Sequence, residues 1–442
     1  MAEFFSDKVL LSGETAEILY NEVKDLPIID YHCHLDQRKI AADAKFEDIG
    51  QMWLSGDHYK HRAMRLCGVD EKYITGDSTW KEKYLKYAEI MPKLYGNPLY
   101  YWTHLELKLV FGITDPLNSG TAEDIYARAN ALIPELSVRK LLKRFNVELI
   151  NTTDDPADSL EQHGTYDGIE VRPTFRPDKL YTLDEGYLKK LGASAGINIR
   201  TLDDLESAVR SRLDFFVSKG CCISDHGFSD FPARIADRKE AAALFSDREN
   251  LTAEEKDAFF GYLLVFLMKE YRKRGIAAQM HFSVIRNVNS GIFKTLGPDA
   301  GCDVIGEEPK LAAVLQFLDS IPEAERPPII LYTLNPNAIS SLACLSGAFR
   351  NVYVGAAWWF NDTLDGIRRN LNLMSEYSCL GTHLGMLTDS RAFLSYSRFD
   401  FFRRILASFL AEKVDKGEYP LEDAKKLAAD ISYGNIKRFL NR

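Results

Sequence analysis

The sequence predicts an α/β fold, a (β/α)8 or TIM-like barrel with a large, mainly helical insertion after its first strand. Two observations support this prediction. Eight short apolar runs alternate with segments of helical periodicity, which is typical of parallel strands covered by helices. Nearly all of the runs end in Asp, His, Arg, Asn or Trp, and in such barrels the functional side chains follow the carboxyl ends of the strands.

The eight runs are the predicted strands. A short apolar stretch bounded by polar residues suits a parallel strand, because helices cover both of its faces. The runs are LPIIDYHCH (26–34), VELINTTDD (147–155), GIEVRPTFR (168–176), GCCISDHG (220–227), IAAQMHFSV (276–284), PIILYTLNP (328–336), NVYVGAAWW (351–359) and HLGMLTDS (383–390).

Helices are predicted between the runs. Thr252 and Glu255 form a Thr-x-x-Glu capping box, which opens a helix that runs to about Arg274 and stops at Gly275. Its most apolar part, residues 259–268, is too short to cross a bilayer and is interpreted as one buried helix. Helical periodicity also marks residues 202–218 and 309–320.

One interval is much longer than the others. Residues 36–146 separate the first two runs and are rich in Tyr, Trp, Lys and Glu, with helical patterns at 79–94 and 121–145. We predict a helical insertion over the mouth of the barrel, because a loop that follows a strand emerges there. The barrel then comprises residues 1–35 and 147–442.

The composition restricts the class of partner. With 55 Lys and Arg against 64 Asp and Glu, the net charge is -9, which argues against nucleic acid but allows a small anionic ligand. The seven cysteines include no Cys-x-x-Cys pair, which favours reduced thiols. Asp7 and Glu14 interrupt any apolar core of a signal peptide. We expect a cytoplasmic protein with neither a membrane nor a nucleic-acid partner.

The first and last runs carry the candidate metal ligands. His32 and His34 are two apart, so on a strand they point to the same face, and two imidazoles suit a divalent metal. Asp389 ends the eighth run, which neighbours the first when a barrel closes. The alternatives are that the histidines only satisfy a strand end and that Asp389 caps a helix.

Further polar and aromatic residues end other runs. His281 is either a weak metal ligand, a substrate contact or a structural histidine. Arg176 and Arg391 suit recognition of a carboxylate, unless they form only surface ion pairs. Trp358 and Trp359 suit the wall of a sugar pocket, although we expect one of them to pack in the core, because neighbouring residues of a strand face opposite ways.

Several segments carry a family resemblance. IIDYHCHLD resembles the first-strand signature of the amidohydrolase superfamily. In order and spacing, further segments resemble uronate isomerases, also called glucuronate isomerases, over nearly the whole chain. These segments are GDHYKHRAMRLCGV, LINTTDDP, RPTFRPDK, QMHFSVIRNVN, AAWWFND and LTDSRAFLSYSRFDFFRR.

The resemblance implies an activity and a set of roles. The family interconverts D-glucuronate with D-fructuronate, and D-galacturonate with D-tagaturonate, and binds one divalent metal, usually Zn²⁺. It implies metal ligands (His32, His34 and Asp389), catalytic residues (Tyr59, Asp389 and Arg391) and substrate contacts (His58, Arg176, His281 and Trp358). Arg172 is the alternative to Arg176. A homo-oligomer, for instance a trimer, is also implied.

The resemblance also implies the number of metal ions and the course of the reaction. The fourth run lacks the Lys with which many superfamily hydrolases bridge two metals, so one metal is expected. We expect a proton to move from C2 to C1 through an enediolate, with Tyr59 as the acceptor and its pKa lowered by Arg391 and the metal. The alternatives are a mononuclear metal-dependent hydrolase on the same barrel and an inactive scaffold protein.

Overall fold

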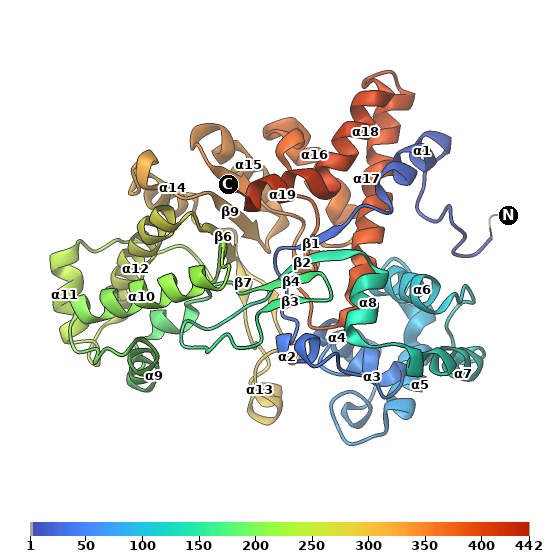
Figure 1. Cartoon of the computed structure of the whole chain (residues 1–442), viewed down its shortest axis with the longest axis horizontal. Coiled ribbons are helices and arrows are strands. Elements are labelled where there is room, and N and C mark those ends of the chain that lie inside the picture. The colour runs from blue at the N-terminus through green and yellow to red at the C-terminus, as the bar shows by residue number, and fades with distance from the viewer. Residues whose placement is uncertain (1–2, 442) are drawn as a thin grey trace.

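The computed structural model describes residues 3–441 and has an α/β architecture with two mainly parallel sheets (Figure 1). Within those residues the strands are short. They are β1 (Ile28–Asp30), β2 (Val147–Asn151), β3 (Gly164–Tyr166), β4 (Ile169–Arg172), β5 (Ile223–Gly227), β6 (Ala277–Phe282), β7 (Val284–Ile285), β8 (Val304–Ile305), β9 (Ile329–Thr333) and β10 (Val352–Val354).

The helices precede, separate and follow these strands. They are α1 (Glu14–Val23), α2 (Gln37–Ala41), α3 (Ile49–Leu54), α4 (His58–Leu66), α5 (Trp80–Ile90), α6 (Pro98–Phe111), α7 (Ala122–Leu132), α8 (Val138–Arg144), α9 (Glu185–Ala195), α10 (Leu202–Ser218), α11 (Arg238–Ser246), α12 (Ala253–Arg274), α13 (Ser290–Leu296), α14 (Leu311–Asp319), α15 (Ile339–Ala348), α16 (Leu364–Tyr377), α17 (Ser397–Asp415), α18 (Leu421–Ala429) and α19 (Asn435–Leu440).

The two sheets continue into one another at Phe175. One sheet has the order β1-β2-β4-β3 and the other the order β10-β9-β6-β5, and every pair is parallel except β3 with β4. Phe175 follows β4 and forms parallel bridges with Asp154, beyond β2, and with Ser224 in β5. Seven of the eight predicted runs therefore contain strands of one parallel arrangement, which confirms the alternation of strands and helices.

The eighth run is not a strand, so that prediction is wrong in its detail. Gly385 and Asp389 have φ angles of 78° and 45°, and this left-handed backbone interrupts an extended ladder. The segment still lies beside β1, because Asp389 N donates to His32 O at 3.0 Å and His34 N donates to Ser390 O at 3.0 Å. Its position agrees with the prediction although its conformation does not.

The predicted helices are present where the capping signals place them. Thr252 and Glu255 form the capping box of α12, and Gly275 ends this helix in the left-handed conformation with φ of 69°. α10 has the predicted bounds, and α14 lies within 309–320. In residues 3–441 no helix is long and apolar enough to cross a membrane. All seven cysteines are free, as expected.

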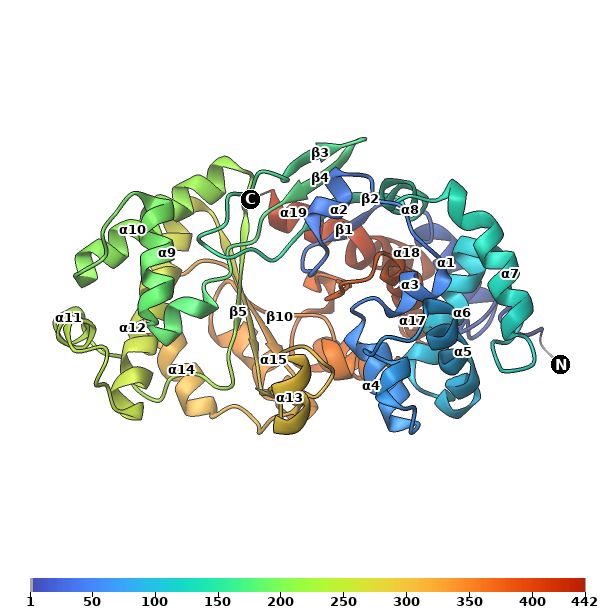
Figure 2. The ribbon, with the colours of Figure 1, turned by 90° about the horizontal axis from the view of Figure 1, so that it is seen from below.

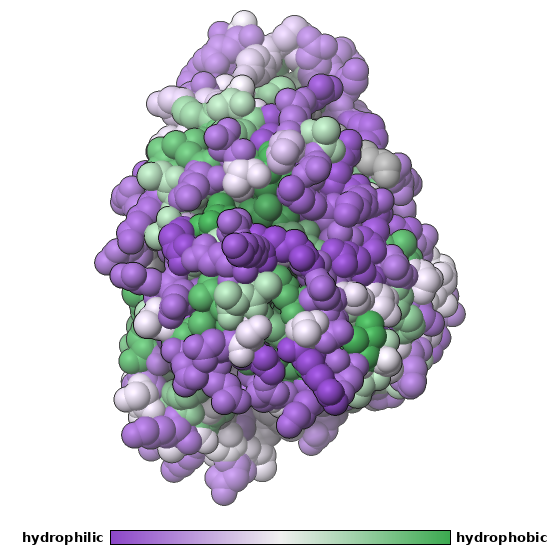
Figure 3. Space-filling view, turned by 90° about the vertical axis from the view of Figure 1, so that its left-hand side faces the viewer, coloured by the Kyte–Doolittle hydropathy of each residue, from purple (hydrophilic) through white to green (hydrophobic). Residues whose placement is uncertain are grey.

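Residues 36–146 are helical, as predicted, and contribute α2–α8. Figure 2 shows the strands between two groups of helices, with α9–α12 and α14 on one side and α3–α7 on the other. The face on the side of α9–α12 is mainly hydrophilic, with small apolar areas between the polar side chains (Figure 3).

A buried carboxylate fastens the last run to the first strand. Asp30 of β1 is fully buried and accepts hydrogen bonds from Thr388 N at 3.0 Å and from Thr388 Oγ1 at 2.6 Å. Burial raises the pKa of Asp30 to about 6 in spite of these bonds. Removing either bond would leave a carboxylate oxygen short of a donor in the interior.

We therefore expect Thr388→Val to lower the free energy of unfolding by about 1–3 kcal/mol, the cost of leaving a buried acceptor unsatisfied. Urea unfolding measures the change. Thr382→Val is the control, since the Thr382 hydroxyl is exposed and donates only to the nearby Cys379 O. Equal stability of the two variants would contradict this role of Asp30.

Candidate active site

A cavity of about 270 Å³ lies at the carboxyl ends of the strands and gathers most of the predicted site residues. Of the nine predicted residues, all but Tyr59 line it. The cavity is lined by His32, His34, His58, Thr153, Arg176, His281, Arg286, Asp299, Trp358, Trp359, Asp389 and Arg391. The structure thus brings together side chains that are more than 350 positions apart in sequence.

His32, His34 and Asp389 converge as the strand geometry predicts. Asp389 Oδ1 lies 3.1 Å from His32 Nε2 and 3.2 Å from His34 Nε2. Burial alone would raise the pKa of Asp389, but the hydrogen bonds with both imidazoles outweigh it and hold the pKa well below its ordinary value. Burial lowers the pKa of His34 to about 4, so this imidazole is neutral near pH 7 and free to act as a ligand.

This donor set fits a divalent metal. One ligand atom from each of the three residues lies within 4.8 Å of the others, and two imidazole nitrogens with a carboxylate oxygen are typical zinc ligands. The remaining Asp389 Oδ2 accepts a hydrogen bond from Trp358 Nε1 at 2.7 Å, which fixes the carboxylate. The alternation of faces along a strand predicted that the two histidines lie together, and the expected neighbourhood of the first and last runs placed Asp389 beside them.

Asp225 is a site residue that the sequence analysis missed. It lies in β5 and is fully buried, with Oδ1 2.7 Å from His281 Nδ1 and Oδ2 2.9 Å from Arg176 Nη1. Burial would raise the pKa of Asp225, but Arg176, His32 and His281 lower it well below the ordinary value. Its position at the end of the fourth run was the available signal.

Asp225 also forms a second possible ligand group, with His32 and His281. This group shares His32 with the first. The Arg176 guanidinium already lies against Asp225 and is also held by Asp178, with Nε 2.8 Å from Asp178 Oδ2. A second cation beside Asp225 would meet that positive charge, so the arrangement favours one metal.

The arginines of the cavity are all paired with carboxylates. Arg391 Nη2 lies 2.7 Å from Asp299 Oδ2, and Arg286 Nη1 lies 3.3 Å from Asp303 Oδ2. The partners, Asp299 and Asp303, lie between β6 and α14 and outside every segment that the sequence analysis identified. Arg172, the alternative to Arg176, does not line the cavity and instead pairs with Glu170 at 2.5 Å.

Both tryptophans of the seventh run are buried in the hydrophobic core, where packing was expected for one of them, and both also line the cavity. Trp359 has a φ of 54°, and this left-handed residue turns the chain after Trp358. Strict alternation of faces holds only while the backbone stays extended. Trp358 donates a hydrogen bond to Asp389, and its predicted role as a substrate contact remains a prediction.

Tyr59 is not one of the lining residues but lies next to the cavity, with its ring 4.9 Å from that of His58, which lines it. The expectation that Arg391 lowers the pKa of Tyr59 is wrong for this structure. Burial and the nearby Asp362 raise the pKa well above its ordinary value, and the cation over the Tyr59 ring is Arg398, at 4.7 Å. The hydroxyl donates to Asp362 Oδ2 at 3.3 Å.

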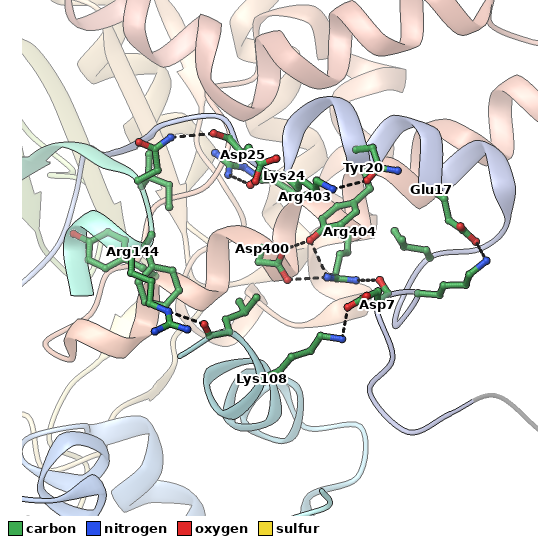
Figure 4. A pocket seen from close by; sticks show the side chains of 18 residues that line it. Asp7, Glu17, Tyr20, Lys24, Asp25, Lys108, Arg144, Asp400, Arg403 and Arg404 are labelled. Carbon is green, nitrogen blue, oxygen red and sulfur yellow. Dashed lines mark hydrogen bonds and ion pairs between the residues drawn. The ribbon is translucent and has the colours of Figure 1, made fainter. Parts of the chain in front are cut away.

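A larger cavity of about 670 Å³ has a different character (Figure 4). It lies beside the N-terminal segment, and its charged side chains bind one another. Lys108 pairs with Asp7 at 2.7 Å, and Arg404 pairs with Asp400 at 2.7 Å while donating to the carbonyls of Asp7 and Val9. These contacts attach the N-terminal segment to α6 and α17, so the charged residues of this cavity have a structural role.

Comparisons with known proteins agree with the site. A family model described as glucuronate isomerase matches residues 1–440. The chain is 43% identical to the uronate isomerase of Caldanaerobacter subterraneus subsp. tengcongensis, with all of both chains covered. Among solved structures it resembles the uronate isomerase of Thermotoga maritima (TM-score 0.96, 35% identity, 99% of this chain and 100% of that one). It also resembles the glucuronate isomerase of Caulobacter crescentus (TM-score 0.93, 29% identity, 99% and 97%).

The buried charges around Asp225 predict a large effect on stability. Asp225→Asn leaves the half-buried Arg176 and the buried His281 without their shared carboxylate, so the free energy of unfolding should fall by about 3–5 kcal/mol. Asp203→Asn, which removes a partner of Arg238 on the exposed surface, should leave it nearly unchanged. Chemical unfolding of both variants provides the comparison, and an equally small change in both would refute the assignment.

Proposed function

We propose, from the premise that the chain belongs to the glucuronate isomerase family and is a uronate isomerase, that it acts on both hexuronate pairs. It interconverts D-glucuronate with D-fructuronate, and D-galacturonate with D-tagaturonate. The observation that carries this proposal is the meeting of His32, His34 and Asp389 in a cavity lined by arginines. An anionic sugar requires the cations, and the polar side chains suit its hydroxyl groups.

Substrate binding is assigned to Arg176 and the residues around it. Arg176 lines the cavity, fixed by Asp178 and Asp225, and with His58 it holds the carboxylate of the sugar. His281 and Trp358 contact the sugar, with ring centroids 4.6 Å apart. Because Arg176 is held rigidly from two sides, it binds an anion with little loss of side-chain entropy.

We assign one Zn²⁺ ion to His32, His34 and Asp389. When bound, the ion supplies a positive centre that polarises a substrate oxygen. Asp389 accepts the proton of the anomeric hydroxyl group as the sugar ring opens. It then donates this proton to the ring oxygen. The hydrogen bond from Trp358 Nε1 to Asp389 Oδ2 keeps the Asp389 carboxylate oriented for this transfer.

Isomerisation then moves a proton from C2 to C1 through an enediolate. Tyr59 carries this proton, and the Arg391 guanidinium stabilises the negative charge that develops on the sugar oxygens. Asp299 holds Arg391 in place at 2.7 Å. A hydrolase that acts on a neutral amide would not need the arginines of this cavity. Their presence therefore argues against the hydrolase alternative.

We also propose how the barrel closes, where its insertion lies, and where and in what oligomeric form the enzyme acts. The strands close into a (β/α)8 barrel of residues 1–35 and 147–442, with residues 36–146 as an insertion over its mouth. The position of residues 388–390 beside β1 supports closure. The enzyme acts in the cytoplasm as a homo-oligomer, without nucleic-acid or membrane partners.

Activity is tested by incubation with D-glucuronate and with D-galacturonate, from which a keto acid should form. Tyr59→Phe should lower kcat by about 100-fold to 10,000-fold, the contribution of one positioned proton-transfer group. Exchange of the C2 proton with solvent, followed by NMR, should fall in parallel. Full exchange in Tyr59→Phe would remove Tyr59 from this role, and no turnover of either uronate by the wild type would refute the function.

Metal content provides a separate test. The wild type should hold about one zinc per chain, and Asp389→Asn should lose most of it, because one of the three ligand groups is weakened. Elemental analysis after dialysis measures the ratio. Asp48→Asn, in the helical region, should keep the wild-type content. Normal zinc content and normal turnover in Asp389→Asn would contradict the metal assignment.

A further inference from the structure

The protonation state of Tyr59 poses a chemical problem for the proposed mechanism. Its phenol is 9% exposed, and its burial and the neighbouring Asp362 carboxylate keep it neutral. A neutral phenol can take a proton from C2 only if it gives up its own proton at the same time. The group that accepts this second proton must lie within hydrogen-bond reach of Tyr59 Oη.

Asp362 is the group in that position. It follows the seventh run of the sequence, is 3% exposed, and accepts the Tyr59 hydroxyl bond at Oδ2 over 3.3 Å. Its second oxygen, Oδ1, has no hydrogen-bond partner among the described residues. A buried carboxylate with one oxygen unsatisfied is costly, and such groups call for an explanation beyond packing.

Arg398 fixes the geometry of this pair. The guanidinium lies 4.7 Å from the Tyr59 ring and 4.0 Å from the Trp102 ring, and its Nη1 is 3.7 Å from Asp362 Oδ2. The same Nη1 donates to Thr388 O at 2.8 Å, beside Asp389. Tyr59, Asp362 and the segment before Asp389 are therefore held by one buried cation.

We propose that Asp362 is a positioning residue that accepts the Tyr59 proton while Tyr59 accepts the proton from C2. The C2–H bond breaks, and its electron pair forms the C1–C2 double bond as the carbonyl pair moves onto O1. The C2 proton binds Tyr59 Oη, and the original phenolic proton moves to Asp362 Oδ2. This inference rests on the proposed function and on the assigned role of Tyr59.

The return step restores every group. The O2 hydroxyl proton moves to O1, the remaining O2 electron pair forms the C2 carbonyl, and the double-bond pair takes the proton from Tyr59 at C1. Tyr59 then recovers its proton from Asp362. No oxidant or further co-reactant is needed, and the net result is the transfer of one proton from C2 to C1 and one from O2 to O1.

The charges that face Asp362 suit an acceptor that is ionised near neutral pH. Burial raises its pKa to about 7, with Arg398 lowering it, Asp389 raising it and the Tyr59 bond lowering it. An acceptor must be ionised before the reaction, so kcat should fall as the pH decreases through about 7. A purely structural carboxylate would not impose this dependence on the reaction.

The decisive variant is Asp362→Asn, which keeps an oxygen that can accept the Tyr59 bond but removes the proton acceptor. We expect kcat to fall by about 100-fold or more with KM changed less than about threefold, and the acidic limb of the pH profile near 7 to disappear. The double variant Tyr59→Phe/Asp362→Asn should be no slower than Tyr59→Phe, because both changes break one relay.

Two further variants keep the result interpretable. Asp362→Glu retains a carboxylate in a displaced position and should recover part of kcat together with an acidic limb shifted from that of the wild type. Asp48→Asn is the matched control, because Asp48 Oδ2 also accepts a tyrosine hydroxyl, that of Tyr126, at 2.7 Å, but away from the cavity. It should show wild-type kcat and pH profile.

Several outcomes would overturn the relay. They are full turnover with an unchanged pH profile in Asp362→Asn, multiplicative losses in the double variant, and full C2-proton exchange in Tyr59→Phe. If Asp362→Asn does not fold, an acidic limb of Asp362→Glu identical to that of the wild type would overturn it instead. An inactive wild type would refute the proposed function itself, whereas an active wild type with a fully active Asp362→Asn refutes only the relay.

Discussion

The site depends on one contact, the docking of residues 388–390 against the first strand. Asp30 holds Thr388 from inside the core, and backbone bonds join His32 to Asp389 and His34 to Ser390. These bonds set the distance between the two imidazoles and the Asp389 carboxylate. Because Asp30 is buried and its bonds are directional, a small shift of this segment would separate the ligand group.

Charge compensation is the second constraint on the cavity. Arg176, Arg286 and Arg391 each have at least one carboxylate partner within the chain. An unpaired cation in such a place would be costly, so the carboxylates stabilise the fold around the cavity and orient the arginines.

Tyr59 illustrates why a residue's chemistry depends on the side chains behind it. The family resemblance implies a catalytic role for Tyr59, but it gives no information about the pKa of the phenol. The pKa follows from burial and from Asp362 and Arg398, which lie more than 300 positions away in sequence. The same neighbours that make the phenol a poor base on its own supply a route for its proton.

The sequence by itself determined the alternation of strands and helices, the caps of α12, and the residues at the ends of most strands, because these follow from local periodicity and short spacings. His32 and His34 were predictable since a strand alternates its faces. Tertiary structure alone decided the left-handed turns at Trp359 and Asp389, the pairing of Asp225 with Arg176, and the positions of Asp299 and Asp362. These features arise from contacts between distant segments, and no local pattern of residues encodes such contacts.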